Sequence, residues 1–264
     1  MASLCWDHVV HYVNDLDAAI AAFTARGLVA RRGGIHPGWG THNALSYFDL
    51  TYIEFLSVHD HTELNAISPW QVVSRDAGRC LPHREILSRI ALRTDDIEAI
   101  ATALTGYNLS LSPILEGKRY DTAGHLIAWK MLTIDGSFRG VPYPFIIQWQ
   151  DSDEERRAYL KRRGFLQPPP VAKTAITEAT IETTDPEALA AHWSKLFALP
   201  YAPGKPSRLT LNNATFYVQP GPANRITSIG LKTSSSTLSD THIDIGAGSY
   251  YVNASVSEQV SIRH

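Results

Sequence analysis

Cysteine is scarce in this sequence, and long apolar runs are missing. The 264 residues include two cysteines, Cys5 and Cys80, which form neither a disulfide framework nor the ligand spacing of a zinc finger. No hydrophobic stretch approaches the roughly 20 residues that span a bilayer, and the first residues lack the basic and apolar regions of a signal peptide. We therefore expect a cytoplasmic protein with no membrane partner.

Charge of one sign does not dominate, and two common catalytic motifs are absent. The formal net charge is -2, which gives no indication of a nucleic-acid partner. The Gly-rich stretch "RGGIHPGWG" lacks the Lys-Ser/Thr end of a phosphate-binding loop, and no Gly-x-Ser-x-Gly elbow occurs. With 44% hydrophobic and 19% charged residues, the composition is that of a globular protein with a sizeable core.

The first sixty residues predict one unit made of a strand, a helix and further strands. The predicted elements are, in order, a strand at 5–13, a helix at 16–23, a loop at 33–43 and strands at 44–48 and 51–58. Asp15 suits the N-cap of the helix, and Gly27 suits its left-handed end. His8 and Glu54 each stand in the middle of an outer strand, so each flanking strand carries a polar residue on an otherwise apolar face.

Two further segments repeat this order of elements. A helical linker at 61–86 leads to a second module at 87–150, in which Arg89 takes the place of His8 and His125 that of His42. The segment 151–170 is interpreted as a solvated charged helix followed by a Pro-rich linker that ends at a triple proline. Residues 171–264 predict a third, shorter module with few ligand-type residues, and we expect it to be structural.

Five short motifs resemble the vicinal oxygen chelate superfamily, and its glyoxalase-like domain in particular. They are "DHVVHYV", "YIEFLSV", "HPGWGTHNAL", "AGHLIAWKML" and "PFIIQW". The resemblance implies an α+β fold in which paired βαβββ modules, here 3–60 and 87–150, curl their mixed sheets around a cavity. It also implies a lyase, isomerase or dioxygenase acting on a small oxygenated metabolite, with a divalent metal such as Zn, Fe, Mn or Ni. Pairing of modules across subunits would make the protein a homodimer.

The resemblance places metal ligands on the first and last strands of each module. His8 and Glu54 match ligand positions, whereas the second module has Arg89 and Gln148 there. A guanidinium has no lone pair to donate and repels a cation, and two ligands are fewer than a zinc site uses. His42 or His125 could complete the set if their loops turned inward.

Two alternatives to the metal enzyme follow from the same residues. In a metal-free enzyme, Arg89 and Gln148 would bind the substrate, Arg89 as the anchor of an anionic group, and His8 and Glu54 would act as an acid–base pair. In a non-catalytic protein, the same cavity would bind a small molecule without turnover. Trp39 fits a cavity wall or a cover for the sheet edge.

A carboxylate in an apolar strand is costly to bury alone, so Glu54 predicts a partner. We expect that partner to be His8 or Arg89, and a purely structural Arg89–Glu54 ion pair is a further alternative. The remaining loop histidines, His36 among them, are expected to be solvated. These are His36, His59, His61 and His83.

Overall fold

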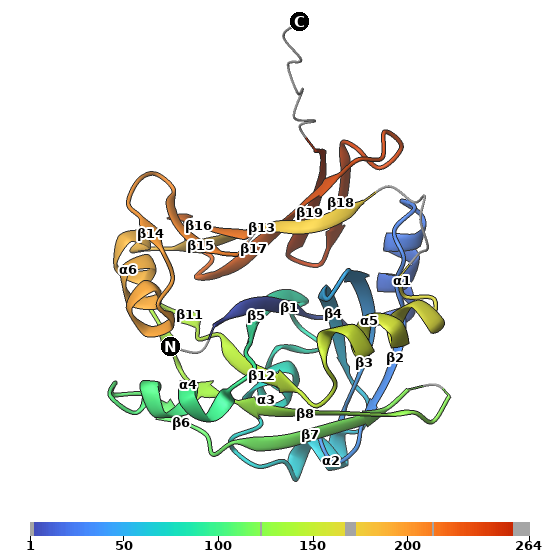
Figure 1. The fold of residues 1–264 in the computed structure, drawn as a ribbon, viewed down its shortest axis with the longest axis horizontal. Helices are drawn as coiled ribbons and strands as arrows, with labels where there is room; N and C mark the ends of the chain where they lie inside the picture. Colours follow the sequence, from blue (N-terminus) through green and yellow to red (C-terminus); the bar gives the residue numbers. More distant parts are fainter. Residues whose placement is uncertain (1–2, 122, 167–172, 213, 256–264) are drawn as a thin grey trace, which may run out of the picture.

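A computed structural model describes residues 3–121, 123–166, 173–212 and 214–255, and it consists of a closed barrel and an open sheet (Figure 1). The barrel runs in the order β1-β4-β3-β2-β7-β8-β12-β5. Its strands are β1 (Cys5–Tyr12), β2 (Arg31–His36), β3 (Thr41–Phe48), β4 (Thr51–Val58), β5 (Ile86–Arg93), β7 (Leu115–Tyr120), β8 (Leu126–Leu132) and β12 (Phe145–Trp149).

The barrel is assembled from two units with the same connectivity. In the first unit β1 pairs with β4 in parallel, and in the second β5 pairs with β12 in parallel. The antiparallel pairing of β1 with β5 joins the units. Each first strand is followed by a capped helix, α1 (Leu16–Thr24) or α4 (Ile97–Leu104), whose Asp N-cap accepts backbone N–H groups. The predicted α+β fold of paired, curled βαβββ modules is thereby confirmed.

The segment 33–43 is a β-hairpin rather than the predicted loop. Its arms are β2 and β3, and His36 pairs with Thr41 across the turn. Gly33 and Gly34 lie within β2, at a register shift opposite β3, and added Cβ atoms there would clash with Asn43 and with the Tyr120 backbone. The glycines therefore allow the strands to approach closely. From the sequence alone, glycines with this role look the same as glycines in a flexible loop.

The linker between the units covers the barrel interior. It contains α2 (His61–Asn65) and α3 (Val72–Cys80), and α3 packs Val72 and Val73 against Val10 and Leu56. Two short ribbons complete this part, β6 (Ser110–Leu111) with β9 (Ile134–Asp135) and β10 (Ser137–Phe138) with β11 (Val141–Pro142). None of the described helices is long and apolar enough to cross a bilayer.

The charged helix after the barrel is packed against it and is not the solvated connector expected from its composition. This helix, α5 (Asp153–Arg162), begins with a capping box between Ser152 and Glu155. Its Arg156 and Leu160 are buried, and Leu160 joins a cluster with Leu45 of the barrel. The many charged residues of the helix obscured in the sequence that one of its faces, with Arg156 and Leu160, packs inward. The triple proline, from which a Pro-rich linker was predicted, lies outside the described residues.

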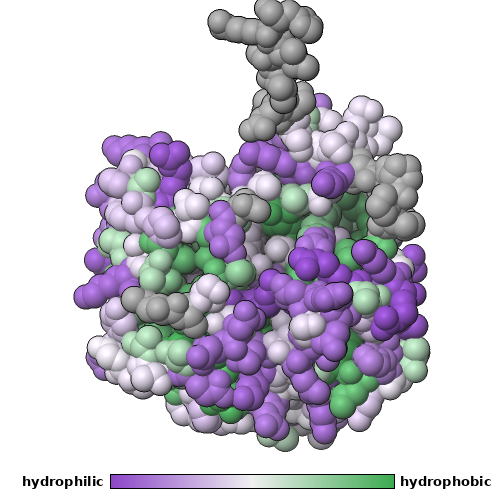
Figure 2. All heavy atoms as spheres, in the orientation of Figure 1, coloured by the Kyte–Doolittle hydropathy of each residue, from purple (hydrophilic) through white to green (hydrophobic). Residues whose placement is uncertain are grey.

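The C-terminal part forms a seven-stranded open sheet in the order β14-β15-β16-β13-β17-β19-β18. Its elements are β13 (Thr174–Thr183), α6 (Pro186–Phe197), β14 (Tyr201–Ala202), β15 (Ser207–Leu211), β16 (Ala214–Pro220), β17 (Arg225–Thr233), β18 (Thr241–Ile245) and β19 (Gly248–Ala254). One hydrophobic core joins this sheet to the outside of the barrel, with Ile229 and Leu231 in the same cluster as Val9 and Ile90. On the face in Figure 2, hydrophilic residues dominate the surface, and hydrophobic ones show mainly between the open sheet and the barrel.

Candidate functional site

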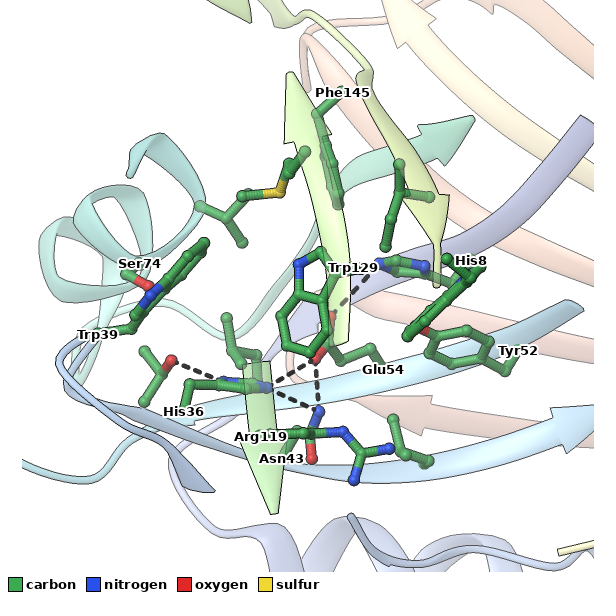
Figure 3. Close-up of a pocket in the computed structure, with 17 residues that line it drawn as sticks. His8, His36, Trp39, Asn43, Tyr52, Glu54, Ser74, Arg119, Trp129 and Phe145 are labelled. Carbon is green, nitrogen blue, oxygen red and sulfur yellow. Dashed lines mark hydrogen bonds and ion pairs between the residues drawn. The ribbon is translucent and has the colours of Figure 1, made fainter. Parts of the chain in front are cut away.

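The interior of the barrel holds a cavity beneath α3, with about 530 Å³ of empty space when the part open to solvent is counted. Trp39, Trp129, Trp149, Tyr52 and Phe145 give it aromatic walls, as Figure 3 shows for most of them. Its polar lining consists of His8, His36, Thr41, Asn43, Glu54, Ser74 and Arg119. A concave, mainly apolar space with a few converging polar groups is the usual form of a small-molecule site.

His8 and Glu54 point into this cavity from neighbouring strands, and their side chains meet. Because β1 and β4 run parallel with Val10 opposite Glu54, the alternation of side chains brings both residues to the inner face. His8 Nε2 lies 3.5 Å from Glu54 Oε2, and the His8 ring stacks on Tyr52 with 4.5 Å between centroids. The sequence-based expectation that Glu54 would have His8 as a partner agrees with this geometry.

Asp7 fixes the other edge of the His8 ring. The pairing of β1 with β5 shifts register between Trp6 and His8, and at this irregularity Asp7 Oδ1 lies 2.7 Å from His8 Nδ1. Asp7 is fully buried, and its second oxygen accepts a 2.9 Å hydrogen bond from Trp149 Nε1. Strict alternation would have sent Asp7 and His8 to opposite faces, so sequence reasoning missed Asp7.

Asp7 is held as a carboxylate, and this decides how His8 is oriented. Burial raises the pKa of Asp7, but the Arg156 guanidinium, the His8 hydrogen bond and Arg93 outweigh burial and bring the pKa below its usual value. An ionised Asp7 accepts a hydrogen bond from His8 Nδ1–H, so in the neutral ring the Nε2 atom faces Glu54 and the cavity with its lone pair. This is the arrangement in which a histidine serves as a general base.

Glu54 and His36 are joined through Asn43. The Asn43 Nδ2 group donates to Glu54 Oε1 at 2.6 Å and lies 3.3 Å from His36 Nε2, while His36 Nδ1 lies 2.9 Å from Thr41 Oγ1 (Figure 3). Burial lowers the pKa of His36 to about 4, so its ring is neutral near pH 7. The expectation that His36 is solvated is wrong, because the residue is 6% exposed. Alternation across the 33–43 hairpin would have placed it inward.

Arg89 does not enter the cavity, and its predicted pairing with Glu54 is wrong. Its Nη2 donates to Asp76 Oδ2 of α3 at 2.8 Å, and its Nη1 donates to the Tyr143 carbonyl at 2.7 Å. Gln148 also lies elsewhere, with its Oε1 accepting the Ile97 N–H at 2.9 Å at the start of α4. Both residues tie connecting segments to the barrel.

The two other predicted histidines lie outside the cavity, whereas Trp39 lines it. His42 is half-buried on the outer face of β3, with its ring 5.0 Å from that of His59. His125 is exposed and stacks on Tyr159 at 5.0 Å. Of the predicted site residues, His8, Glu54 and Trp39 are therefore brought together, and Arg89, Gln148, His42 and His125 are not.

The donor set does not fit a divalent metal. Within the part of the chain that the structure describes, no group of three or more His, Cys, Asp or Glu side chains is placed to hold a metal ion. The Nε2 lone pair of His36 faces the Asn43 amide, which leaves His8 Nε2 and Glu54 Oε2 as the available donors. A zinc or iron site takes three protein ligands at least, so this pair is one short.

Paired βαβββ modules that close around such a cavity define the vicinal oxygen chelate fold. The model of the glyoxalase-like domain family matches residues 6–197, so the chain belongs to that family. A hypothetical protein from Staphylococcus aureus is similar over 96% of this chain and 100% of its own, with a TM-score of 0.83 and 23% identity.

Two enzymes of known activity are more distant in structure. A mutant of 4-hydroxymandelate synthase from Streptomyces coelicolor has a TM-score of 0.50 and 12% identity, and the match covers 88% of this chain and 71% of that one. Methylmalonyl-CoA epimerase from Mycobacterium tuberculosis has a TM-score of 0.40 and 19% identity over 58% of this chain and 91% of its own. No curated protein matches the sequence.

Proposed function

We propose that this protein is a glyoxalase-like enzyme that moves a proton on a carbon atom next to the carbonyl of a small oxygenated metabolite. The observation that carries the proposal is the Asp7–His8–Glu54 arrangement inside an aromatic-walled cavity. A homodimer is part of the same proposal and comes from the family resemblance, and the cytoplasmic location expected from the sequence is kept as part of it.

The side chains divide the work between a base and an acid. His8 Nε2 takes the proton, and the Asp7 carboxylate stabilises the imidazolium that forms. Glu54 Oε2, 3.5 Å from His8 Nε2 and oriented by Asn43, receives that proton from the imidazolium and returns it to a neighbouring atom of the same substrate, which restores both groups. A proton taken by one group and returned by the other isomerises the substrate, and positioned acid–base pairs of this kind contribute about 10²–10⁴-fold in rate.

The walls of the cavity favour this chemistry. Trp39, Trp129 and Trp149 line the space with apolar rings, and His8 and Glu54 are buried from water. Electrostatic interactions are stronger when water is excluded, so the negative charge on the substrate oxygen is stabilised by nearby donors more than it would be in solution. Arg119 is the cationic group in the lining of this cavity.

Deuterium exchange tests the proposal without knowledge of the complete reaction. The purified protein is incubated in D₂O with a panel of α-keto aldehydes, thiol adducts and α-hydroxy ketones, and loss of the α-proton is followed by NMR. We expect exchange with at least one compound and a fall of about 10²-fold or more in Glu54→Gln and His8→Gln. His42→Gln, on the outer face of β3, is the matched control and keeps full exchange.

Two outcomes would contradict the proposal. Equal exchange in wild type and Glu54→Gln would show that this carboxylate has no part in proton transfer. Saturable binding of panel compounds with no exchange in any of them would favour the non-catalytic binding protein instead.

A further inference from the structure

A second pocket adjoins the cavity and shares two residues with it. Its empty space is about 350 Å³ when the part open to solvent is counted, and Arg119 and Trp149 line both spaces. Arg156 of α5 and the ring of Tyr47 complete its inner wall. A ligand group in this pocket would therefore lie next to a molecule bound in the cavity.

Arg119 is a buried cation without an acidic partner. It lies on β7 and is 4% exposed, and its Nη1 donates to the Gly33 carbonyl at 2.8 Å. Among the described residues, no carboxylate oxygen lies within 4.0 Å of its guanidinium nitrogens. An unpaired charge is costly to bury, so a group of this kind is kept where a ligand supplies the counter-charge.

Arg156 faces the same pocket with donors that are not used. It is 7% exposed, and within the described ranges neither Nη1 nor Nη2 makes a hydrogen bond. The nearest carboxylate oxygens, on Asp7 and Asp153, lie 3.7 and 3.8 Å away, which is beyond hydrogen-bond distance. The guanidinium lies over the Trp149 ring at 4.3 Å, which holds its plane beside the pocket.

The remaining polar groups of the pocket include one further donor and one acid. Burial raises the pKa of Tyr47, so its hydroxyl keeps its proton and can donate. Asp151 is the acidic residue of the lining, and because it is exposed, water weakens its repulsion of an anion. The buried Asp7 carboxylate, 3.7 Å from Arg156, balances part of the charge of that residue, so the positive charge left for a ligand comes mainly from Arg119, with the Tyr47 hydroxyl as a further donor.

We propose that Arg119 and Arg156 bind the carboxylate of the substrate, so that the substrate is a small organic acid. A guanidinium matches a carboxylate with two parallel N–H donors, which fixes orientation as well as position. The assignment of this carboxylate to the substrate depends on the proposed function, since its reacting carbon would lie beside His8 and Glu54. The binding of a carboxylate by the two arginines does not depend on the proposed function.

Calorimetric titration with benzoate, benzamide and inorganic phosphate tests the site. Benzoate carries the carboxylate on an aromatic ring, and benzamide is its neutral counterpart. We expect benzoate to bind the wild type about 10–100-fold more tightly than benzamide, and Arg119→Met and Arg156→Gln to remove that difference. Arg157→Gln is the matched control, because Arg157 is the next residue of α5 but is exposed and paired with Asp49.

Thermal unfolding separates ligand binding from a structural role. Without ligand, Arg119→Met should unfold at or above the wild-type temperature, because the variant no longer buries an unpaired charge. With benzoate, the wild type and Arg119→Lys should gain stability and Arg119→Met should not.

The proposal fails if benzamide binds as well as benzoate, or if phosphate binds tightly and benzoate does not. It also fails if Arg119→Met keeps full benzoate affinity, or unfolds well below the wild type in the absence of ligand. His42→Gln, which changes a residue outside both pockets, should bind benzoate normally. Benzoate binding without proton exchange would therefore count against the proposed function alone, and exchange without preference for a carboxylate would count against this site alone.

Discussion

The barrel and the open sheet share a pattern of strand pairing but differ in how many faces they bury. In the barrel, β1 pairs in parallel with β4 and antiparallel with β5; in the open sheet, β13 pairs in parallel with β16 and antiparallel with β17. Nearly every residue of β1 is buried, whereas β13 alternates between core residues such as Ile181 and partly exposed ones such as Glu178.

Closure of the sheet therefore decides which of the two can hold buried charge. The inner face of the barrel keeps Asp7, His8 and Glu54 away from water, and each finds partners in the protein. On the open sheet Glu178 lies 3.5 Å from Lys232 with both side chains partly exposed. A carboxylate in the first setting depends on its partners and can have its reactivity tuned, while one in the second is solvated.

The largest expected effect comes from Asp7→Asn, which keeps the size of the side chain and removes its charge. The change leaves the guanidinium groups of Arg93 and Arg156 without this buried counter-charge, and breaking a buried ion pair costs about 3–5 kcal/mol. Urea unfolding at pH 7 measures the resulting loss in the free energy of unfolding. Glu178→Gln on the open sheet is the comparison and should change stability by less than about 0.5 kcal/mol. Equal losses would remove the distinction between the two sheets.

The next effect is a loss of stability in mild acid that arises from buried histidine. Burial lowers the pKa of His36 to about 4, so between pH 6.5 and 4 the unfolded chain binds a proton that the folded chain does not. Stability therefore falls as pH falls through this window, by about 3 kcal/mol for this residue. The loss attributable to Asp7 begins lower, because its folded pKa lies below 3.8 and its contribution is complete above that value.

Unfolding free energies measured from pH 4.5 to 6.5 check this prediction. His36→Gln should reduce the slope with pH without abolishing it, because burial lowers the pKa of His11 to about 3 and that residue contributes with the same sign. His61→Gln, which changes an exposed residue of α2, should leave the slope unchanged. A wild-type slope that His36→Gln does not alter would contradict a buried neutral ring at this position.

Local periodicity was sufficient to predict how His8 and Glu54 meet, but not how Arg89 is used. His8 and Glu54 lie in β1 and β4, and with Val10 opposite Glu54 in this parallel pair, counting by two along each strand places both on one face. The direction of Arg89 depends on Asp76 of α3 and on the Tyr143 carbonyl, both of which reach it only through the tertiary fold. Because Arg89 occupies a ligand position in the sequence, it was interpreted as part of the site, although its partner is Asp76 in the linker.

The residues that sequence reasoning missed share a different cause. Asp7 faces His8 because of a bulge, and His36 faces the cavity because a Gly-rich segment is a strand. Neither irregularity leaves a pattern of its own in the sequence. Arg119 and Arg156 lie within charged stretches, and what distinguishes them from solvated arginines is burial, which depends on the packing of α5 and β7.

The smallest expected effect lies where the two sheets meet. His11 on the outer face of β1 forms a 2.5 Å hydrogen bond with the Tyr250 hydroxyl of β19, and both residues are fully buried. Tyr250→Phe keeps the ring contacts with Phe23 and Phe55 but leaves the His11 nitrogen without this partner, at a cost of about 1–2 kcal/mol. Tyr251→Phe is the control, since Tyr251 is exposed and stacks on His242 through its ring alone. Urea unfolding in which Tyr251→Phe costs as much as Tyr250→Phe would show that this bond does not help to hold the open sheet on the barrel.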